Sequence, residues 1–162
     1  MLAETFMVKI VLPYISNLGK RLVKSPKVYI ADSGITAALL QLHNFNEING
    51  HPAFGAIWEQ IVLSNLQGEF PQSEIYFYRT AKGAEIDFVM KYRNRISAIE
   101  CKNSLSPVLQ RGFYNAIEDI APVHSFIVAP VKKGWAMKKG IDVVSIGELT
   151  DRINWQINNE PH

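Results

Sequence analysis

The stretch EIDFVMKYRNRISAIECK, residues 85–102, decides the fold. Its first half holds an apolar run from Ile86 to Met90, whose alternation and β-branched content predict a strand over residues 85–92. Its second half predicts a further strand over residues 96–102. Strands that follow each other so closely are expected to pair antiparallel. The stretch therefore predicts two paired strands of a sheet.

Polar residues within these two strands carry the chemical signal. Glu100 and Lys102 are two residues apart, so they project from one face of their strand, and Cys101 projects from the other as a core thiol. Antiparallel pairing brings Asp87 beside Glu100. A carboxylate in an apolar run needs a partner, because burying its charge alone costs several kcal/mol. The residues predict either a cation site or, as the plainer alternative, a salt bridge with Lys102.

A cation site of this kind has a defined chemistry. Paired carboxylates suit Mg²⁺ or Mn²⁺, which binds one or two carboxylates together with waters and phosphate oxygens. Lys102 would neutralise charge that develops on a phosphate. A third carboxylate, Glu59, lies in a stretch whose apolar residues recur at helical spacing. Three carboxylates and a lysine in this arrangement are typical of a two-metal phosphodiesterase, although Glu59 alone also fits a solvated helix position.

Two further polar residues follow the paired strands. Residues 107–120 predict a helix, on which Gln110 and Tyr114 are four residues apart and share a face. The alternative for both is a polar helix face with a half-buried aromatic ring.

The ordered set of Glu59, Asp87, Glu100-x-Lys102 and Gln110-x-x-x-Tyr114 resembles the PD-(D/E)xK nuclease superfamily, and its last element resembles the RecB-type branch. The resemblance implies an α/β fold: a restriction-endonuclease-like mixed sheet with flanking helices. It implies that Asp87 and Glu100 bind metal, that Lys102 assists the nucleophile, and that Glu59 positions the attacking water. Gln110 and Tyr114 would contact the substrate or the residues and waters around the metal. Ile86 stands where many members have Pro.

A second set of short motifs is spread over nearly the whole chain: Leu12-Pro13-Tyr14, Lys27-Val28-Tyr29, Asp32-Ser33-Gly34, Trp58-Glu59, Tyr78-Arg79-Thr80 and Glu85-Ile86-Asp87. With these motifs the chain resembles the C-terminal region of prokaryotic AAA-type ATP-binding proteins, in which a P-loop ATPase and a winged-helix segment precede a domain of unknown function. The chain contains no Gly-x-x-x-x-Gly-Lys-Ser/Thr loop, so no ATP site is expected in it. The resemblance implies an upstream ATPase domain or a partner chain as the partner.

The remaining sequence predicts how the chain is organised. Residues 5–14 and 27–31 predict a hairpin, the wing of a winged-helix remnant, and Asp32 or Ser33 caps a helix to about Leu42. A polar connection then marks a boundary, giving a winged-helix-like remnant and connector over 1–50 and a nuclease-like domain over 51–162. Further strands are expected near residues 75–80, 125–129 and 142–146, with a short closing helix from Gly147 or Glu148.

Composition limits the class of protein. The chain has 162 residues, 48% of them hydrophobic and 20% charged, which fits a folded domain with its own core. The single cysteine excludes an internal disulfide and fits a reducing cytoplasm, and the four histidines have no zinc-ligand spacing. No signal peptide or membrane-spanning run is expected.

The net charge of +2 is too small to indicate a nucleic-acid partner by itself, so the local distribution of charge has to be considered. Two basic clusters are candidate DNA contacts. The alternative for each is a solvated loop. One cluster lies in the predicted hairpin loop: Lys20, Arg21, Lys24 and Lys27. The other surrounds Trp135, whose ring could stack on a base: Lys132, Lys133, Lys138 and Lys139.

Two functions remain open at this point. The first is a metal-dependent nuclease that cleaves DNA, and the second is a non-catalytic docking or DNA-binding module that keeps a nuclease-like fold. Exposed apolar residues near Leu2 to Val11 are expected if an upstream domain is missing, and a homodimer could cover them.

Overall fold

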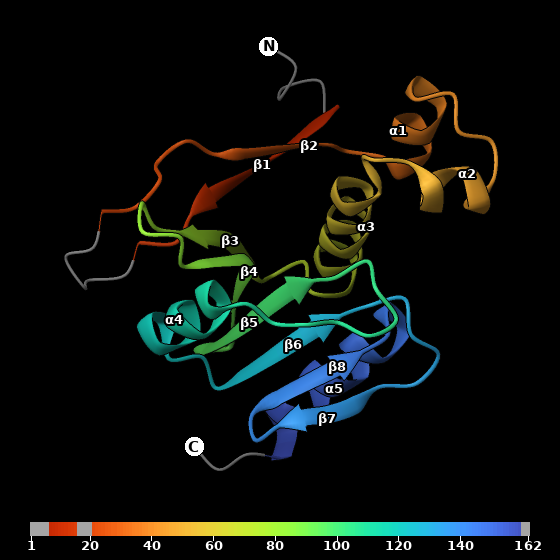
Figure 1. Cartoon of the computed structure of the whole chain (residues 1–162). Helices are drawn as coiled ribbons and strands as arrows, with labels where there is room; N and C mark the ends of the chain where they lie inside the picture. Colours follow the sequence, from red (N-terminus) through yellow and green to blue (C-terminus); the bar gives the residue numbers. More distant parts are fainter. Residues whose placement is uncertain (1–6, 16–20, 160–162) are drawn as a thin grey trace.

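A mixed β-sheet runs through the protein (Figure 1). The structure, a computed structural model, describes residues 7–15 and 21–159. Within those ranges eight strands form one sheet in the order β2-β1-β3-β4-β5-β6-β8-β7. The strands are β1 (Val8–Pro13), β2 (Lys27–Ile30), β3 (Glu74–Arg79), β4 (Glu85–Tyr92), β5 (Arg95–Cys101), β6 (His124–Val128), β7 (Trp135–Lys138) and β8 (Ile141–Val144).

Strand directions follow from the connections. β3, β4 and β5 are antiparallel neighbours, whereas β5 and β6 run parallel because α4 (Arg111–Ile120) returns the chain between them. β6 and β8 are also parallel, and β7 pairs antiparallel with β8 at the edge. The predicted α/β class with a mixed sheet is confirmed, and its likeness to restriction endonucleases stays a prediction.

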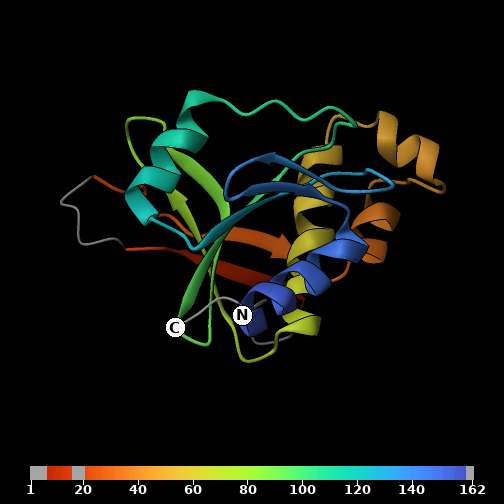
Figure 2. The same ribbon diagram turned by 90° about the horizontal axis from the view of Figure 1, so that it is seen from below.

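Helices cover both faces of the sheet. α3 (Phe54–Glu69) and α5 (Ile146–Asn159) contact each other on one face, and α4 contacts β4 on the other, as Figure 2 shows in the view from below. Short helices α1 (Ser33–Leu39) and α2 (Phe45–Gly50) flank α3. Covered on both faces, the central strands are apolar almost throughout, which explains the run that surrounds Asp87.

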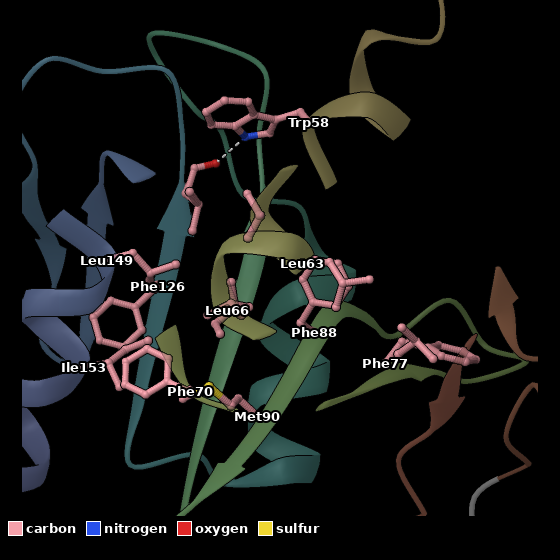
Figure 3. Packing of buried hydrophobic residues seen from close by; sticks show 14 of the residues in the cluster. Trp58, Leu63, Leu66, Phe70, Phe77, Phe88, Met90, Phe126, Leu149 and Ile153 are labelled. Atoms are coloured by element: carbon pink, nitrogen blue, oxygen red, sulfur yellow. Dashed lines mark hydrogen bonds between the residues drawn. The ribbon is translucent and has the colours of Figure 1, made fainter. Parts of the chain in front are cut away.

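The larger part of the core lies between α3, α5 and the sheet (Figure 3). Leu63 and Leu66 of α3 are fully buried, one turn apart, against the sheet. Trp58 lies one turn before them and donates from Nε1 to the carbonyl oxygen of Val128 at 3.0 Å. This bond ties the first turns of α3 to the end of β6, and it fixes the position of the neighbouring Glu59.

Several predicted boundaries differ from the structure. The helix expected over 107–120 begins at Arg111, because Gln110 has extended backbone angles (φ −91°, ψ 164°) and forms the N-cap. The loop expected around Trp135 contains edge strand β7, and the polar connection after Leu42 contains α2, whose Asn44 cap accepts from the Glu47 amide. The Asp32 cap is confirmed, since its side chain accepts from the Ile35 amide at 2.9 Å.

The predicted hairpin is confirmed, and it joins the main sheet. β1 pairs antiparallel with β2 and parallel with β3, through Leu12 opposite Tyr76 and Pro13 opposite Phe77. The two segments on either side of residue 50 therefore share one sheet rather than forming two separate cores.

Candidate active site

A β-bulge places Asp87. Between the pairs Tyr76–Val89 and Tyr78–Ile86, the single residue Phe77 of β3 faces both Asp87 and Phe88 of β4. Ile86 packs in the cluster beneath α4 and Phe88 packs in the cluster beneath α3. The extra residue lets the Asp87 side chain turn toward the α3 face, where its partners lie.

Asp87 and Glu100 are neighbours at one end of the β4–β5 pair. Phe88 of β4 is paired with Ile99 of β5. Because the strands are antiparallel, Asp87, which precedes Phe88, lies next to Glu100, which follows Ile99. The backbone amide of Cys101 donates to Asp87 Oδ2 at 2.9 Å, and Lys102 Nζ donates to Glu100 Oε1 at 2.8 Å. The predicted juxtaposition of Asp87, Glu100 and Lys102 is present in the structure.

Glu100 is a buried acid with incomplete hydrogen bonding. The residue is 8% exposed, and its Oε2 atom accepts no hydrogen bond from the described part of the chain. Burial and then the charge of Asp87 raise the pKa of Glu100 from 4.5 to about 7, against the opposing effect of Lys102. The carboxylate thus has an unused acceptor in a place where negative charge is unfavourable.

Glu59 is held on the other side of Asp87. Tyr29 of β2 donates its hydroxyl to Glu59 Oε2 at 2.8 Å, and Lys27 Nζ lies 3.4 Å from the same oxygen. Burial and the Asp87 charge raise the pKa of Glu59, with Lys27 and Tyr29 opposing them. Glu59 therefore belongs to the same charged cluster as Asp87.

Lys27 lies at the centre of this cluster. Its Nζ atom is 3.1 Å from Asp87 Oδ1 and 3.8 Å from Glu85 Oε1, in addition to the contact with Glu59. Burial disfavours its charge, but the acids around it raise its pKa above the ordinary value. Sequence reasoning grouped Lys27 with the hairpin loop. It is instead the first residue of β2, and its side chain is 15% exposed and directed at the carboxylates.

Gln110 and Tyr114 do not share a helix face as predicted, because Gln110 is the N-cap of α4 and only Tyr114 is helical. The ring of Tyr114 packs edge-on against Phe113, and Lys138 Nζ lies 4.5 Å from the ring centre. Both residues lie on or before α4, the helix on the opposite sheet face from α3.

The basic clusters are otherwise exposed. Arg21 and Lys24 are exposed beside the β3–β4 turn, where the Arg21 carbonyl accepts from the Ala81 amide. Lys20 lies outside the described residues. The second cluster flanks β7, with Trp135 41% exposed and with exposed lysines around it: Lys132, Lys133, Lys138 and Lys139.

The donor atoms near Asp87 are those of a hard-cation site. Across residues 7–15 and 21–159, no three His, Cys, Asp or Glu side chains lie close enough together to hold a metal ion. Asp87 and Glu100 are two acids and not three, and they offer only carboxylate oxygens, one of which is buried with no donor among the described residues. Burial raises the pKa of the Cys101 thiol, which keeps it protonated and unsuited to metal binding. An oxygen-only pair fits Mg²⁺ or Mn²⁺ completed by water.

Sequence reasoning assigned Lys27 to a DNA contact and not to the carboxylate cluster, and it missed Tyr29 as a site residue. A signal was present: they are two residues apart around the exposed Val28, so strand alternation puts both on the inner face with Val11. The bulge at Asp87 had no sequence signal, because neither Gly nor Pro marks it.

Comparison with known proteins places these residues in two sequence families. Residues 54–149 match a domain of unknown function, DUF4143, and residues 1–46 match another, DUF8612. Uncharacterized proteins of Mycobacterium bovis and Mycobacterium tuberculosis are each 31% identical over 129 residues, which cover 80% of this chain and 29% of each relative. No solved structure matches the chain. In the part of the chain that is described, none of the helices is long and apolar enough to cross a membrane.

Proposed function

The chain belongs to the DUF4143 family, and from the arrangement of its buried carboxylates we propose that it is a nuclease domain that uses Mg²⁺ or Mn²⁺ to cleave DNA phosphodiesters. The observation that carries the proposal is Glu100 Oε2, a buried acid oxygen beside a second carboxylate, to which no described residue donates a hydrogen bond. Native proteins usually satisfy such an atom with water, an ion or a ligand when the chain offers no donor.

Each residue of the cluster has a role in this proposal. Asp87 and Glu100 would hold the cation, and the Cys101 amide fixes the orientation of Asp87. A divalent cation supplies Lewis acidity toward a phosphate oxygen when it is bound. Lys102, 29% exposed and paired with Glu100, is close enough to solvent to meet a phosphate and offset its developing charge. Glu59, oriented by Tyr29 and Lys27, would help to align the attacking water.

The basic surfaces support a nucleic-acid substrate. The exposed Arg21 and Lys24, and the lysines around Trp135, offer contacts to phosphates and one aromatic ring for stacking. In proteins that contain both an AAA-type ATPase domain and a domain of this family, this domain would act as the C-terminal part of the larger protein. The curated relatives extend well beyond the segment that this chain matches.

Calorimetric titration of Mn²⁺ tests the proposal directly. The wild-type protein should bind Mn²⁺, and the Asp87→Asn, Glu100→Gln double variant should not. Cleavage of labelled single-stranded DNA, duplex DNA and RNA in the same buffer should depend on Mn²⁺ and on both acids. Glu74→Gln is the matched control, because Glu74 is an exposed acid of β3 whose partner is Lys91. Binding that persists in the double variant would exclude this site.

One observation favours the second function, a docking or DNA-binding module without catalysis. Lys27 already forms ion pairs with both Asp87 and Glu59, as in a structural ion network. This second function replaces the first if the wild-type protein binds DNA, does not bind Mn²⁺, and does not cleave DNA when Mn²⁺ is present.

A further inference from the structure

The β1–β2 hairpin supplies a cation to the carboxylate cluster. We propose that the Lys27 ammonium group permanently occupies the position between Asp87 and Glu59, so that the site binds a single divalent cation, between Asp87 and Glu100. The number of cations rests on the proposed function, whereas the role of Lys27 as a resident cation does not.

The contacts of Lys27 support this role. Its Nζ lies 3.1 Å from Asp87 Oδ1 and 3.4 Å from Glu59 Oε2, so it bridges the two acids on the α3 side of β4. The same atom lies 5.9 Å from the centre of the Phe77 ring. An ammonium group that is largely shielded from water and bridges two carboxylates occupies the space that a bridging metal ion would need.

The fold fixes Lys27 in this position. Its backbone is paired with Val11 of β1, and β1 in turn is paired with β3. Strand alternation puts Tyr29 on the same face, where its hydroxyl holds Glu59. Lys27 cannot leave without breaking its ion pairs with Asp87, Glu59 and Glu85, so it is a permanent part of the site.

The arrangement of acceptor atoms leaves room for one further cation. Asp87 uses one oxygen for Lys27 and the other for the Cys101 amide, and Glu59 Oε2 already accepts from two donors. Glu100 Oε2 is the buried carboxylate oxygen without a donor among the described residues. A buried carboxylate oxygen without a donor among the described residues therefore lies on the Glu100 side of Asp87, whereas Lys27 already contacts Asp87 Oδ1 and Glu59 Oε2 on the other side.

Charge leads to the same number. Four acids contact three cationic groups, which leaves one negative charge when all are ionised: Glu59, Glu85, Asp87 and Glu100 against Lys27, Arg79 and Lys102. One divalent cation reverses that charge to a single positive one, which matches one phosphodiester. A second divalent cation would leave a large excess of positive charge in a partly buried place.

The test counts bound Mn²⁺ by calorimetry and, independently, by electron paramagnetic resonance of the unbound ion. We expect one Mn²⁺ per wild-type chain and two per Lys27→Met chain, because the neutral side chain frees the acceptors of Glu59 and Asp87. Adding Glu59→Gln to Lys27→Met should return the number to one. Lys9→Met is the matched control: Lys9 also reaches α3 from the hairpin, but it contacts Ser64 Oγ at 2.9 Å, so the number should stay at one.

The outcomes separate the two proposals. If the wild type binds no Mn²⁺ and Lys27→Met binds one, the role of Lys27 is supported and the proposed nuclease is overturned. Equal numbers in the wild type and a folded Lys27→Met would overturn the role of Lys27. If Lys27→Met is unstable, Mn²⁺ should raise its melting temperature by several degrees more than that of the wild type. If Mn²⁺ raises the melting temperature of neither Lys27→Met nor Lys27→Gln more than that of the wild type, the role of Lys27 is also overturned.

Discussion

The Glu100→Gln variant should be more stable than the wild-type protein in neutral solution without metal. Glutamine keeps the shape of the side chain and removes its charge. In the wild type, burial and the charge of Asp87 raise the pKa of Glu100 from 4.5 to about 7. The folded state therefore holds the proton more tightly than the unfolded chain does, and stability is lost as pH rises from 4.5 toward 7.

The size of the effect follows from that pKa shift. At about 1.4 kcal/mol per pKa unit, the ionised Glu100 costs roughly 3 kcal/mol once the pH exceeds 7. Glu100→Gln removes this cost. The attraction of Lys102 is already included in it, because the pKa of Glu100 rises to about 7 against the opposing effect of Lys102. The net gain at pH 8 should therefore be about 3 kcal/mol.

Urea unfolding at pH 5 and pH 8 in EDTA measures this gain. The variant and the wild type should differ little at pH 5, where Glu100 is mostly protonated when folded, and clearly at pH 8. The control Glu74→Gln, which removes an exposed acid, should leave the free energy of unfolding nearly unchanged at both values. A difference between Glu100→Gln and wild type that is the same at both pH values would refute the reasoning.

Three other predictions concern different parts of the molecule. Trp58→Phe should lower the free energy of unfolding in urea by about 1 kcal/mol, because the indole bond is lost while the Val128 carbonyl still accepts from the Lys102 amide. Lys102→Ala should abolish DNA cleavage and leave the melting temperature nearly unchanged. A clear drop in melting temperature together with the loss of cleavage would mean that the lysine is structural. Light scattering should detect a wild-type dimer that Ile10→Lys, Val28→Lys abolishes, because these residues are 50% and 60% exposed on the outer face of the hairpin.

The strands were predictable because their apolar residues identified them. β4 and β5 were expected within one residue of their observed bounds, and the antiparallel register that places Asp87 near Glu100 followed from their closeness in sequence. The acids and Lys102 could be identified because ionisable groups are expensive inside such strands. The Asp32 cap was predictable for a similar local reason, a side chain three residues before a free amide.

The parts that escaped prediction depend on contacts distant in sequence. β7 forms only because its backbone completes the edge of the sheet beside β8, and its own residues are mostly exposed. The contact of Lys27 with Asp87 joins residues 60 positions apart, through a hairpin that could have packed elsewhere. The bulge arises from the register between β3 and β4, which no single residue determines.

The junction between β1 and β3 has a kinetic consequence. The pairs Leu12–Tyr76 and Pro13–Phe77 join these strands in register, and a few further backbone contacts attach Tyr14 and residues 21–23 to β3 and the turn after it. All of them link segments more than fifty residues apart in the chain. Closing so long a loop for so few backbone bonds is slow and weakly rewarded, so the hairpin should attach last during folding and open first in the native protein. Each opening would withdraw Lys27 from Asp87 and Glu59, and the rate of exchange of the β1 amides with solvent would then report how often the cluster is left without it.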